Sequence, residues 1–224
     1  PEPYVRIISA LGRHRQGLGR DEIAKAVGCV SSGGFTAQLE DLEECGFIRK
    51  YLPVGGENSG IYQLADAFSL FYMTFVEGNS SRDGEYWSAV VNEGRKNDWR
   101  GNAFERVCIA HVRQLKKALG ISGVQSDVYS WKATGSPESR GAQVDLLIDR
   151  RDGIANLCEM KYSANEFVID KQEDENIANR VAAFRRVVGP RRIIHVTIVT
   201  ANGLKHNVYW NNVQSEIGLD DLFA

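Results

Sequence analysis

Two apolar runs separated by a short turn decide the fold: residues 141–150 read GAQVDLLIDR, and residues 154–161 read IANLCEMK. Both runs have the length and the apolar content of a β-strand, and the intervening Arg-Asp-Gly is typical of a turn. A turn of this length predicts that the two strands pair antiparallel. Because side chains alternate along a strand, Glu159 and Lys161 are expected on the same face of the second strand.

Three ionisable residues interrupt these apolar strands: Asp145, Glu159 and Lys161. A charge within a buried strand is costly unless it is paired or binds a cation. Mg²⁺ is commonly held by one or two carboxylates together with waters. We therefore predict a site for Mg²⁺ or Mn²⁺ bound by Asp145 and Glu159, with Lys161 orienting a water or stabilising developing charge. Such a site suits phosphodiester hydrolysis.

Composition places the chain among ordinary globular proteins. It has 224 residues, 43% hydrophobic and 25% charged, enough for one large or two small domains. No apolar run approaches the roughly 20 residues of a membrane span, so we expect no membrane contact. The cysteines form no CxxC pair and predict reduced, buried thiols in a cytoplasmic protein. They are Cys29, Cys45, Cys108 and Cys158.

The charge is distributed unevenly along the chain. Residues 1–94 carry 8 basic and 13 acidic side chains, a net charge of −5, whereas residues 95–224 carry 19 and 16, a net charge of +3. If the protein contacts nucleic acid, the second half is therefore the electrostatically plausible side.

The first 66 residues have the pattern of a winged-helix domain, with three short helices followed by two wing strands, at 47–51 and 61–64, joined by a loop at 53–60. Helix-turn-helix order suggests DNA binding. However, the third helix has no Lys or Arg between Phe35 and Gly46 and carries four acidic residues, which would repel phosphate. We therefore favour a scaffolding or protein-contact role. The acidic residues are Glu40, Asp41, Glu43 and Glu44.

Residues 67–98 predict a helical linker that begins with an aromatic-rich helix and ends near a domain boundary at residue 95. An aromatic stripe at helical spacing indicates interdomain packing more often than a ligand pocket. Residues 99–224 then form the second domain. It opens with one long helix whose apolar stripe runs from Phe104 to Leu115.

Two polar residues on that long helix can each be interpreted in two ways. Glu105 in the first turn is either a helix-start carboxylate, favoured by the helix dipole, or a further member of the metal site. His111 lies on the apolar face and is expected to be a hydrogen-bonded core histidine rather than a metal ligand.

The rest of the second domain alternates strands and a helix. We expect strands at 128–131, 193–200 and 207–210, and a helix at 173–188 stopped by Gly189-Pro190. This helix should bury Ile177 and Phe184 and display Arg180, Arg185 and Arg186 outward, as a DNA-contacting surface.

Together these residues resemble a known superfamily. Glu105 on a leading helix, Asp145 in one strand and the sequence Glu159-Met160-Lys161 in the next are similar to the PD-(D/E)XK nucleases. The larger pattern, including the winged helix, the WRGNAFE sequence at 99–105 and the GAQVDLLIDR sequence, resembles the C-terminal region of archaeal-type AAA ATPases of the DUF234 family. The Pro-Asp pair that names the superfamily is Val144-Asp145 here, which keeps the carboxylate in place.

The resemblance implies an α+β fold, with a winged-helix domain followed by an α/β PD-(D/E)XK nuclease-like domain around a mixed central sheet. It implies that Asp145 and Glu159 bind the metal, that Lys161 is catalytic and that Glu105 is the helix acid of the site. Gln143, two residues before Asp145 and on the same face, is a minor catalytic candidate. The P-loop ATPase domain that precedes this region in the family is not in the sequence. With Pro1 as first residue, we expect the chain to be part of a longer polypeptide containing an N-terminal ATPase domain.

The preferred functional hypothesis is a Mg²⁺- or Mn²⁺-dependent DNA nuclease domain joined to a winged helix. The alternative is a catalytically silent nuclease-like module that mediates assembly, including a homo-oligomer, or regulates the ATPase domain. A third option, a transcription factor that uses the winged helix, ranks lowest because of the acidic third helix.

Overall fold

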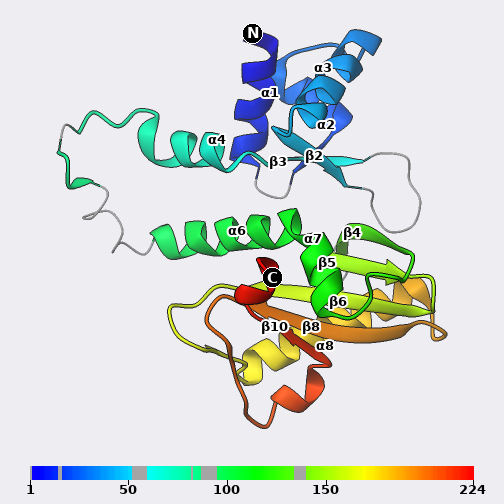
Figure 1. Cartoon of the computed structure of the whole chain (residues 1–224). Helices are drawn as coiled ribbons and strands as arrows, with labels where there is room; N and C mark the ends of the chain where they lie inside the picture. The colour runs from blue at the N-terminus through cyan, green and yellow to red at the C-terminus, as the bar shows by residue number, and fades with distance from the viewer. Residues whose placement is uncertain (1, 15–16, 52–59, 82, 87–94, 134–139) are drawn as a thin grey trace. The chain divides into compact units, whose positions relative to one another are not determined.

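The computed structural model describes residues 2–14, 17–51, 60–81, 83–86, 95–133 and 140–224 (Figure 1). The chain divides into two compact units, Pro1–Val91 and Asn92–Ala224. Both units combine helices with a β-sheet, so the α+β class is confirmed. Within the described ranges, no helix has the length and apolar character needed to cross a membrane. The predicted linker, residues 67–98, spans the division between the units, and its middle lies outside the described residues.

Unit 1 consists of helices packed on a small antiparallel sheet with strand order β1-β3-β2. Its elements are α1 (Glu2–Arg13), β1 (Leu18–Gly19), α2 (Arg20–Val27), α3 (Gly33–Glu44), β2 (Ile48–Tyr51), β3 (Ile61–Leu64), α4 (Ala67–Phe71) and the π-helical turn η1 (Tyr72–Val76). The strands predicted at 47–51 and 61–64 are confirmed as β2 and β3, which pair antiparallel, with Ile48 opposite Leu64. The loop predicted at 53–60 falls almost wholly outside the described residues.

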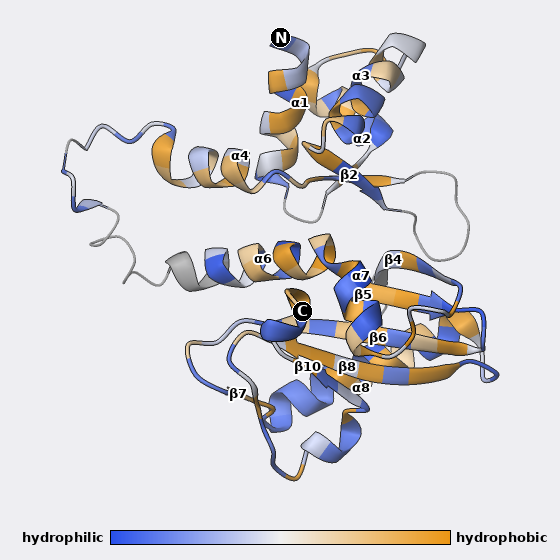
Figure 2. Ribbon diagram, viewed as in Figure 1, coloured by the Kyte–Doolittle hydropathy of each residue, from blue (hydrophilic) through white to orange (hydrophobic). Residues whose placement is uncertain are grey.

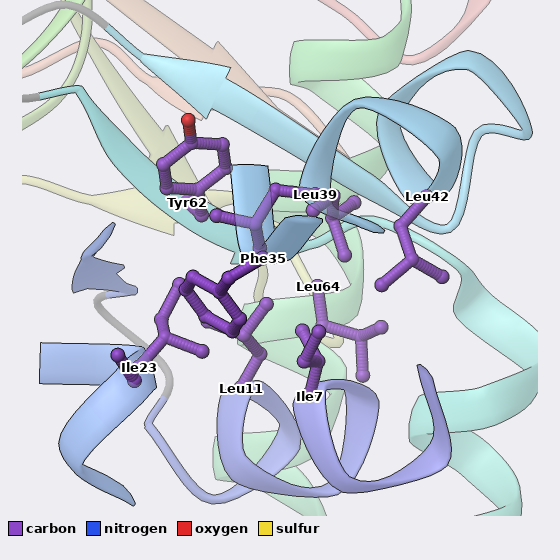
Figure 3. Close-up of a cluster of buried hydrophobic side chains, with 10 residues drawn as sticks. Ile7, Leu11, Ile23, Phe35, Leu39, Leu42, Tyr62 and Leu64 are labelled. Carbon is purple, nitrogen blue, oxygen red and sulfur yellow. The ribbon is translucent and has the colours of Figure 1, made fainter. Parts of the chain in front are cut away.

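The core of unit 1 is an apolar cluster in which α1, α2 and α3 meet the sheet (Figure 3). Phe35 and Leu39 of α3 and Leu64 of β3 are almost completely buried. The remaining members are Ile7, Leu11, Ile23, Ala24, Leu42, Ile48 and Tyr62. Gly28 ends α2 in a left-handed conformation with φ 69°, as its position after the apolar pattern predicted.

Unit 2 is built on a five-stranded mixed sheet with strand order β10-β8-β6-β5-β4. Its elements are α6 (Arg95–Ala110), α7 (Val112–Ala118), β4 (Ser126–Ala133), β5 (Ala142–Arg150), β6 (Ile154–Lys161), β7 (Phe167–Val168), α8 (Lys171–Val188), β8 (Ile193–Thr200), β9 (Leu204–Lys205), the 3₁₀ turn η2 (Trp210–Asn212), β10 (Ser215–Ile217) and the 3₁₀ turn η3 (Asp220–Leu222). The predicted antiparallel hairpin is confirmed as β5 and β6. The predicted central strand is β8, which runs parallel to β6 and is hydrophobic along most of its length (Figure 2).

The two faces of this sheet are covered by different helices. Ile177 of α8 packs with Val196 and Ile198 of β8, and the β6–β8 register places Glu159 beside Ile198 on that same face. Cys158, one residue earlier, points to the opposite face. On that face α6 packs against β6, and burial raises the pKa of the Cys158 thiol to about 12. Glu159, the acid of β6, therefore faces α8, whereas α6 covers the other side.

Two expectations about local structure are wrong. The long helix from Trp99 breaks at His111, whose backbone (φ −106°, ψ 30°) separates α6 from α7. The imidazole Nδ1 of His111 lies 2.7 Å from the carbonyl oxygen of Val107, and the ring stacks edge-on against Phe223. Residues 207–210 are not a strand, because the side chain of Asn207 accepts the N–H of Tyr209 and closes a turn. The last strand is β10, parallel to β8.

The cysteines also differ from expectation. Cys108 and Cys158 are buried, as predicted, but Cys29 and Cys45 are exposed. Cys29 follows the glycine that ends α2, and Cys45 caps α3. Both lie where a helix ends at the surface of unit 1, positions that an apolar sequence context does not reveal.

Candidate metal and catalytic site

The β5–β6 hairpin brings Asp145, Glu159 and Lys161 together. The backbone ladder between the strands ends at the pair Leu146 and Cys158. One residue further, the side chain of Asp145 replaces a backbone partner, because its Oδ2 accepts the N–H of Met160 at 3.2 Å. On β6, Lys161 Nζ lies 3.6 Å from Glu159 Oε2, as expected for two side chains on the same face of a strand.

Helix α8 adds two residues to this group. Its Glu173 Oε1 lies 2.8 Å from Lys161 Nζ and 3.4 Å from a terminal nitrogen of Arg180. Arg180 Nε in turn lies 3.2 Å from Glu159 Oε1. The result is a network of two acids and two bases across β6 and α8, with Asp145 beside it on β5.

One carboxylate oxygen in this network has no hydrogen-bond donor. Glu159 is only 1% exposed, and its Oε1 is buried without a hydrogen-bond partner among the described residues. Arg180 Nε is close to this oxygen, but its single N–H donates to the carbonyl oxygen of Gln143 at 3.0 Å. The short Arg180–Glu159 distance is therefore a charge contact without a well-directed hydrogen bond, and Glu159 Oε1 keeps an unused acceptor site.

Burial dominates the electrostatics of the two acids. Burial, followed by the neighbouring charge of Asp145, raises the pKa of Glu159 to about 8, against the opposing effects of Arg180 and Lys161. Burial also raises the pKa of Asp145 above its usual value, partly offset by the hydrogen bond from Met160 and by Lys161. For Glu173, burial acts upward but Lys161 and Arg180 outweigh it, so its pKa is lowered.

Two other predicted site residues lie at the margin of this group. Glu105 is on α6, the helix on the opposite face of the sheet. Burial raises the pKa of Cys108 on the same helix, and the charges of Asp145 and Glu105 add to that shift. Gln143 is exposed at the start of β5 and enters the network through its backbone carbonyl. The described residues include no group of three or more His, Cys, Asp or Glu side chains placed to hold one ion. The roles of Glu105 and Gln143 stay predictions.

The orientation predicted for Arg180 is wrong. Its side chain is 21% exposed and faces Glu159 and Glu173, whereas Arg185 and Arg186 are exposed as expected. The sequence contained a signal for this. Glu173 and Arg180 are separated from Ile177 and Phe184 by steps of three and four residues, which places all of them on the sheet-facing side of α8. Glu173 was not singled out from the sequence.

Comparisons with known proteins add little. No family model matches the chain, and no curated protein matches it. Among solved structures, the crystal structure titled as a protein of unknown function, AF1548, is 16% identical with a TM-score of 0.36, covering 50% of this chain and 57% of that one. The S. aureus MepR G34K mutant is 20% identical with a TM-score of 0.27, covering 50% of this chain and 75% of its own. TM-scores this low carry no argument about fold or function.

Proposed function

We propose that unit 2 is a PD-(D/E)XK-like nuclease domain that hydrolyses DNA phosphodiesters with Mg²⁺ or Mn²⁺. The observation that carries the proposal is the convergence of Asp145, Glu159 and Lys161 at the point where the β5–β6 ladder ends. A buried acid at such a point reduces stability, and a cation-binding role accounts for its presence.

Asp145 and Glu159 would hold the ion. The fit rests on Glu159 Oε1, which is buried and has no hydrogen-bond donor among the described residues, and on the hard oxygen ligands that two carboxylates provide. Mg²⁺ needs no more than one or two protein carboxylates, because waters and substrate oxygens complete its coordination. The absence of a three-acid group among the described residues is compatible with that chemistry.

When bound, the ion acidifies a water and polarises the phosphorus–oxygen bond. Lys161 would orient the attacking water or stabilise charge that develops on the phosphate. Glu173, 2.8 Å from Lys161 Nζ, would position that ammonium group. Arg180 would hold the Glu159 carboxylate from the other side.

DNA would contact unit 2 through Arg185 and Arg186, which are exposed on α8. Unit 1 would be a winged helix formed by α1, α2, α3 and the wing strands β2 and β3. The acidic surface of α3 favours a protein-contact role for it over DNA recognition. Coupling to an N-terminal ATPase domain remains a prediction of the family resemblance.

The test is cleavage of plasmid and linear DNA with Mg²⁺ or Mn²⁺ by the wild type, Lys161→Ala, Asp145→Ala and Lys171→Ala. Lys171 is the matched control, since it is an exposed lysine on α8 whose partner is Glu175 rather than a site residue. We expect the first two variants to lose at least about 100-fold in rate and the control to keep it. Equal cleavage by all four proteins would refute the proposal.

A second candidate function is a catalytically silent module used for assembly or regulation. The observation that favours it is the ion-pair network itself, in which Lys161 and Arg180 already compensate Glu159 and Glu173. A salt-bridged cluster of this kind can be purely architectural. In that case no divalent ion would bind at the site, and no DNA substrate would be cleaved by the wild type.

A further inference from the structure

A groove runs between α1 and the C-terminal end of α3 in unit 1. It has a volume of about 530 Å³, within the usual range of ligand and peptide sites. Val5 and Ile8 of α1 form one wall, and Leu42 with Phe47 forms the other. These residues belong to one unit, so the groove is defined without reference to unit 2.

The apolar side chains of this groove are unusually open to solvent. Val5 is 58% exposed and Phe47 is 38% exposed, while Leu42 is buried beneath them as part of the unit 1 core. Contiguous exposed apolar residues around a concave surface are typical of a protein-binding site. A groove with apolar residues on both sides suits a helix that carries apolar residues at spacings of three and four.

The rim of the groove is acidic. Asp41 and Glu44 line it, and no basic residue is among its lining residues. The O–H of Tyr4 donates a hydrogen bond to Asp41 Oδ2 at 2.6 Å, which fixes this carboxylate at the rim. Such a surface repels phosphate and attracts lysine and arginine side chains. Charge therefore selects a basic protein segment over nucleic acid.

We propose that this groove binds a basic amphipathic helix of a partner protein. Its apolar residues would contact Val5, Ile8, Leu42 and Phe47, and its flanking Lys or Arg side chains would pair with Asp41 and Glu44. The proposal gives the protein-contact role of unit 1 a defined surface and a defined ligand chemistry. It does not depend on hydrolysis in unit 2.

The experiment uses the full chain and a synthetic helix of about 16 residues, with leucines on one face and lysines elsewhere. Binding is measured by fluorescence anisotropy and located by amide chemical shifts. A scrambled peptide of the same composition is the ligand control. Glu40 provides the protein control, because it is an exposed acid on α3 that does not line the groove.

We expect shift changes at Val5, Ile8 and Phe47, with weaker binding to Val5→Ser. Glu44→Lys should weaken binding at least about fivefold and Glu40→Lys less than about twofold. Equal losses in the two Glu variants, no response to Val5→Ser, or equal binding of the scrambled peptide would overturn the proposal. Shift changes at Val5, Ile8 and Phe47 on addition of duplex DNA alone would overturn it as well, since the groove would then be a nucleic-acid surface.

Discussion

The interiors of the two units differ in chemistry. The core of unit 1 consists of apolar side chains, and its buried polar residue among the described positions is the neutral Gln63, which accepts hydrogen bonds from Arg49. Unit 2 instead buries the carboxylate Glu159 within its central sheet and places Lys161 and Arg180 against it. One chain thus contains one apolar core and one core with a buried ion network.

The difference separates residues needed for folding from residues retained for another reason. An apolar core stabilises a domain in proportion to the area that it removes from water. A buried ion network seldom exceeds the stability of a hydrophobic replacement, because both charges must be desolvated. Glu159 has a raised pKa and an oxygen without a hydrogen-bond donor among the described residues, which supports our proposal that this part of the molecule serves a function beyond stability.

The largest expected effect on stability lies in unit 1. Leu39→Ala should lower the free energy of unfolding of this unit by about 2–5 kcal/mol, because Leu39 is fully buried at the centre of its core. Chemical denaturation followed by circular dichroism and hydrogen exchange measures it. Val30→Ala is the control, since Val30 is exposed and should change stability by less than about 0.5 kcal/mol. Similar values for the two variants would contradict an apolar core centred on Leu39.

A smaller effect is expected from breaking the network of unit 2. Arg180→Met removes the cation beside Glu159 and the hydrogen bond to the carbonyl of Gln143, and should cost about 1.5–3 kcal/mol. The matched variant Arg186→Met alters an exposed arginine of the same helix and should be nearly neutral. Hydrogen exchange of β5 and β6 amides reports on this unit. If Arg186→Met were the more destabilising variant, the inward orientation of Arg180 would be wrong.

The smallest effect concerns a helix end of unit 1. Gly28→Ala should cost about 1 kcal/mol, because Gly28 has a φ of 69°. A Cβ at this position would meet no other atom within 4 Å, so the cost is conformational and not steric. Thermal unfolding of the wild type and the variant measures it, with Gly33→Ala as the control, since that glycine has no positive φ. An unchanged midpoint in Gly28→Ala would show that the left-handed cap contributes nothing.

Much of the fold follows from local sequence pattern. The apolar runs around Asp145 and Glu159 predicted the central hairpin, and Gly28 and Gly189 marked the ends of two helices correctly. β1 was missed because a two-residue strand has no periodicity of its own. The pairing of β1 with β3 requires a glycine at position 17, because a Cβ there would lie 2.5 Å from the carbonyl oxygen of Tyr62.

The site was predictable only in part. Strand alternation placed Glu159 and Lys161 on the same face, since that rule depends on the backbone alone. The inward orientation of Arg180 was not predicted, although its spacing from Ile177 and Phe184 places it on the sheet-facing side of α8. Glu173, which pairs with Arg180, lies on the same face of α8. The contact between Arg180 and Glu159 of β6 depends on tertiary packing, which local sequence pattern does not reveal.

The affinity for a divalent ion should depend on pH. Burial and the charge of Asp145 raise the pKa of Glu159 to about 8, so ion binding below that pH must displace a proton from this carboxylate. Affinity should therefore rise with pH and level off above about pH 8, with at most about a tenfold change per pH unit below it. Glu159→Gln cannot release this proton, and its residual binding should vary less with pH.

The most direct test of the central claim is a calorimetric titration of the full chain with Mn²⁺ at about pH 8.5, where Glu159 is mostly ionised. We expect the wild type to bind one ion and Asp145→Asn and Glu159→Gln each to weaken binding at least about tenfold. As a control, Asp152→Asn alters an acid in the turn after β5 that pairs with Arg150 and should bind as the wild type does. No binding by the wild type, or equal binding by all four proteins, would contradict a metal site at Asp145 and Glu159.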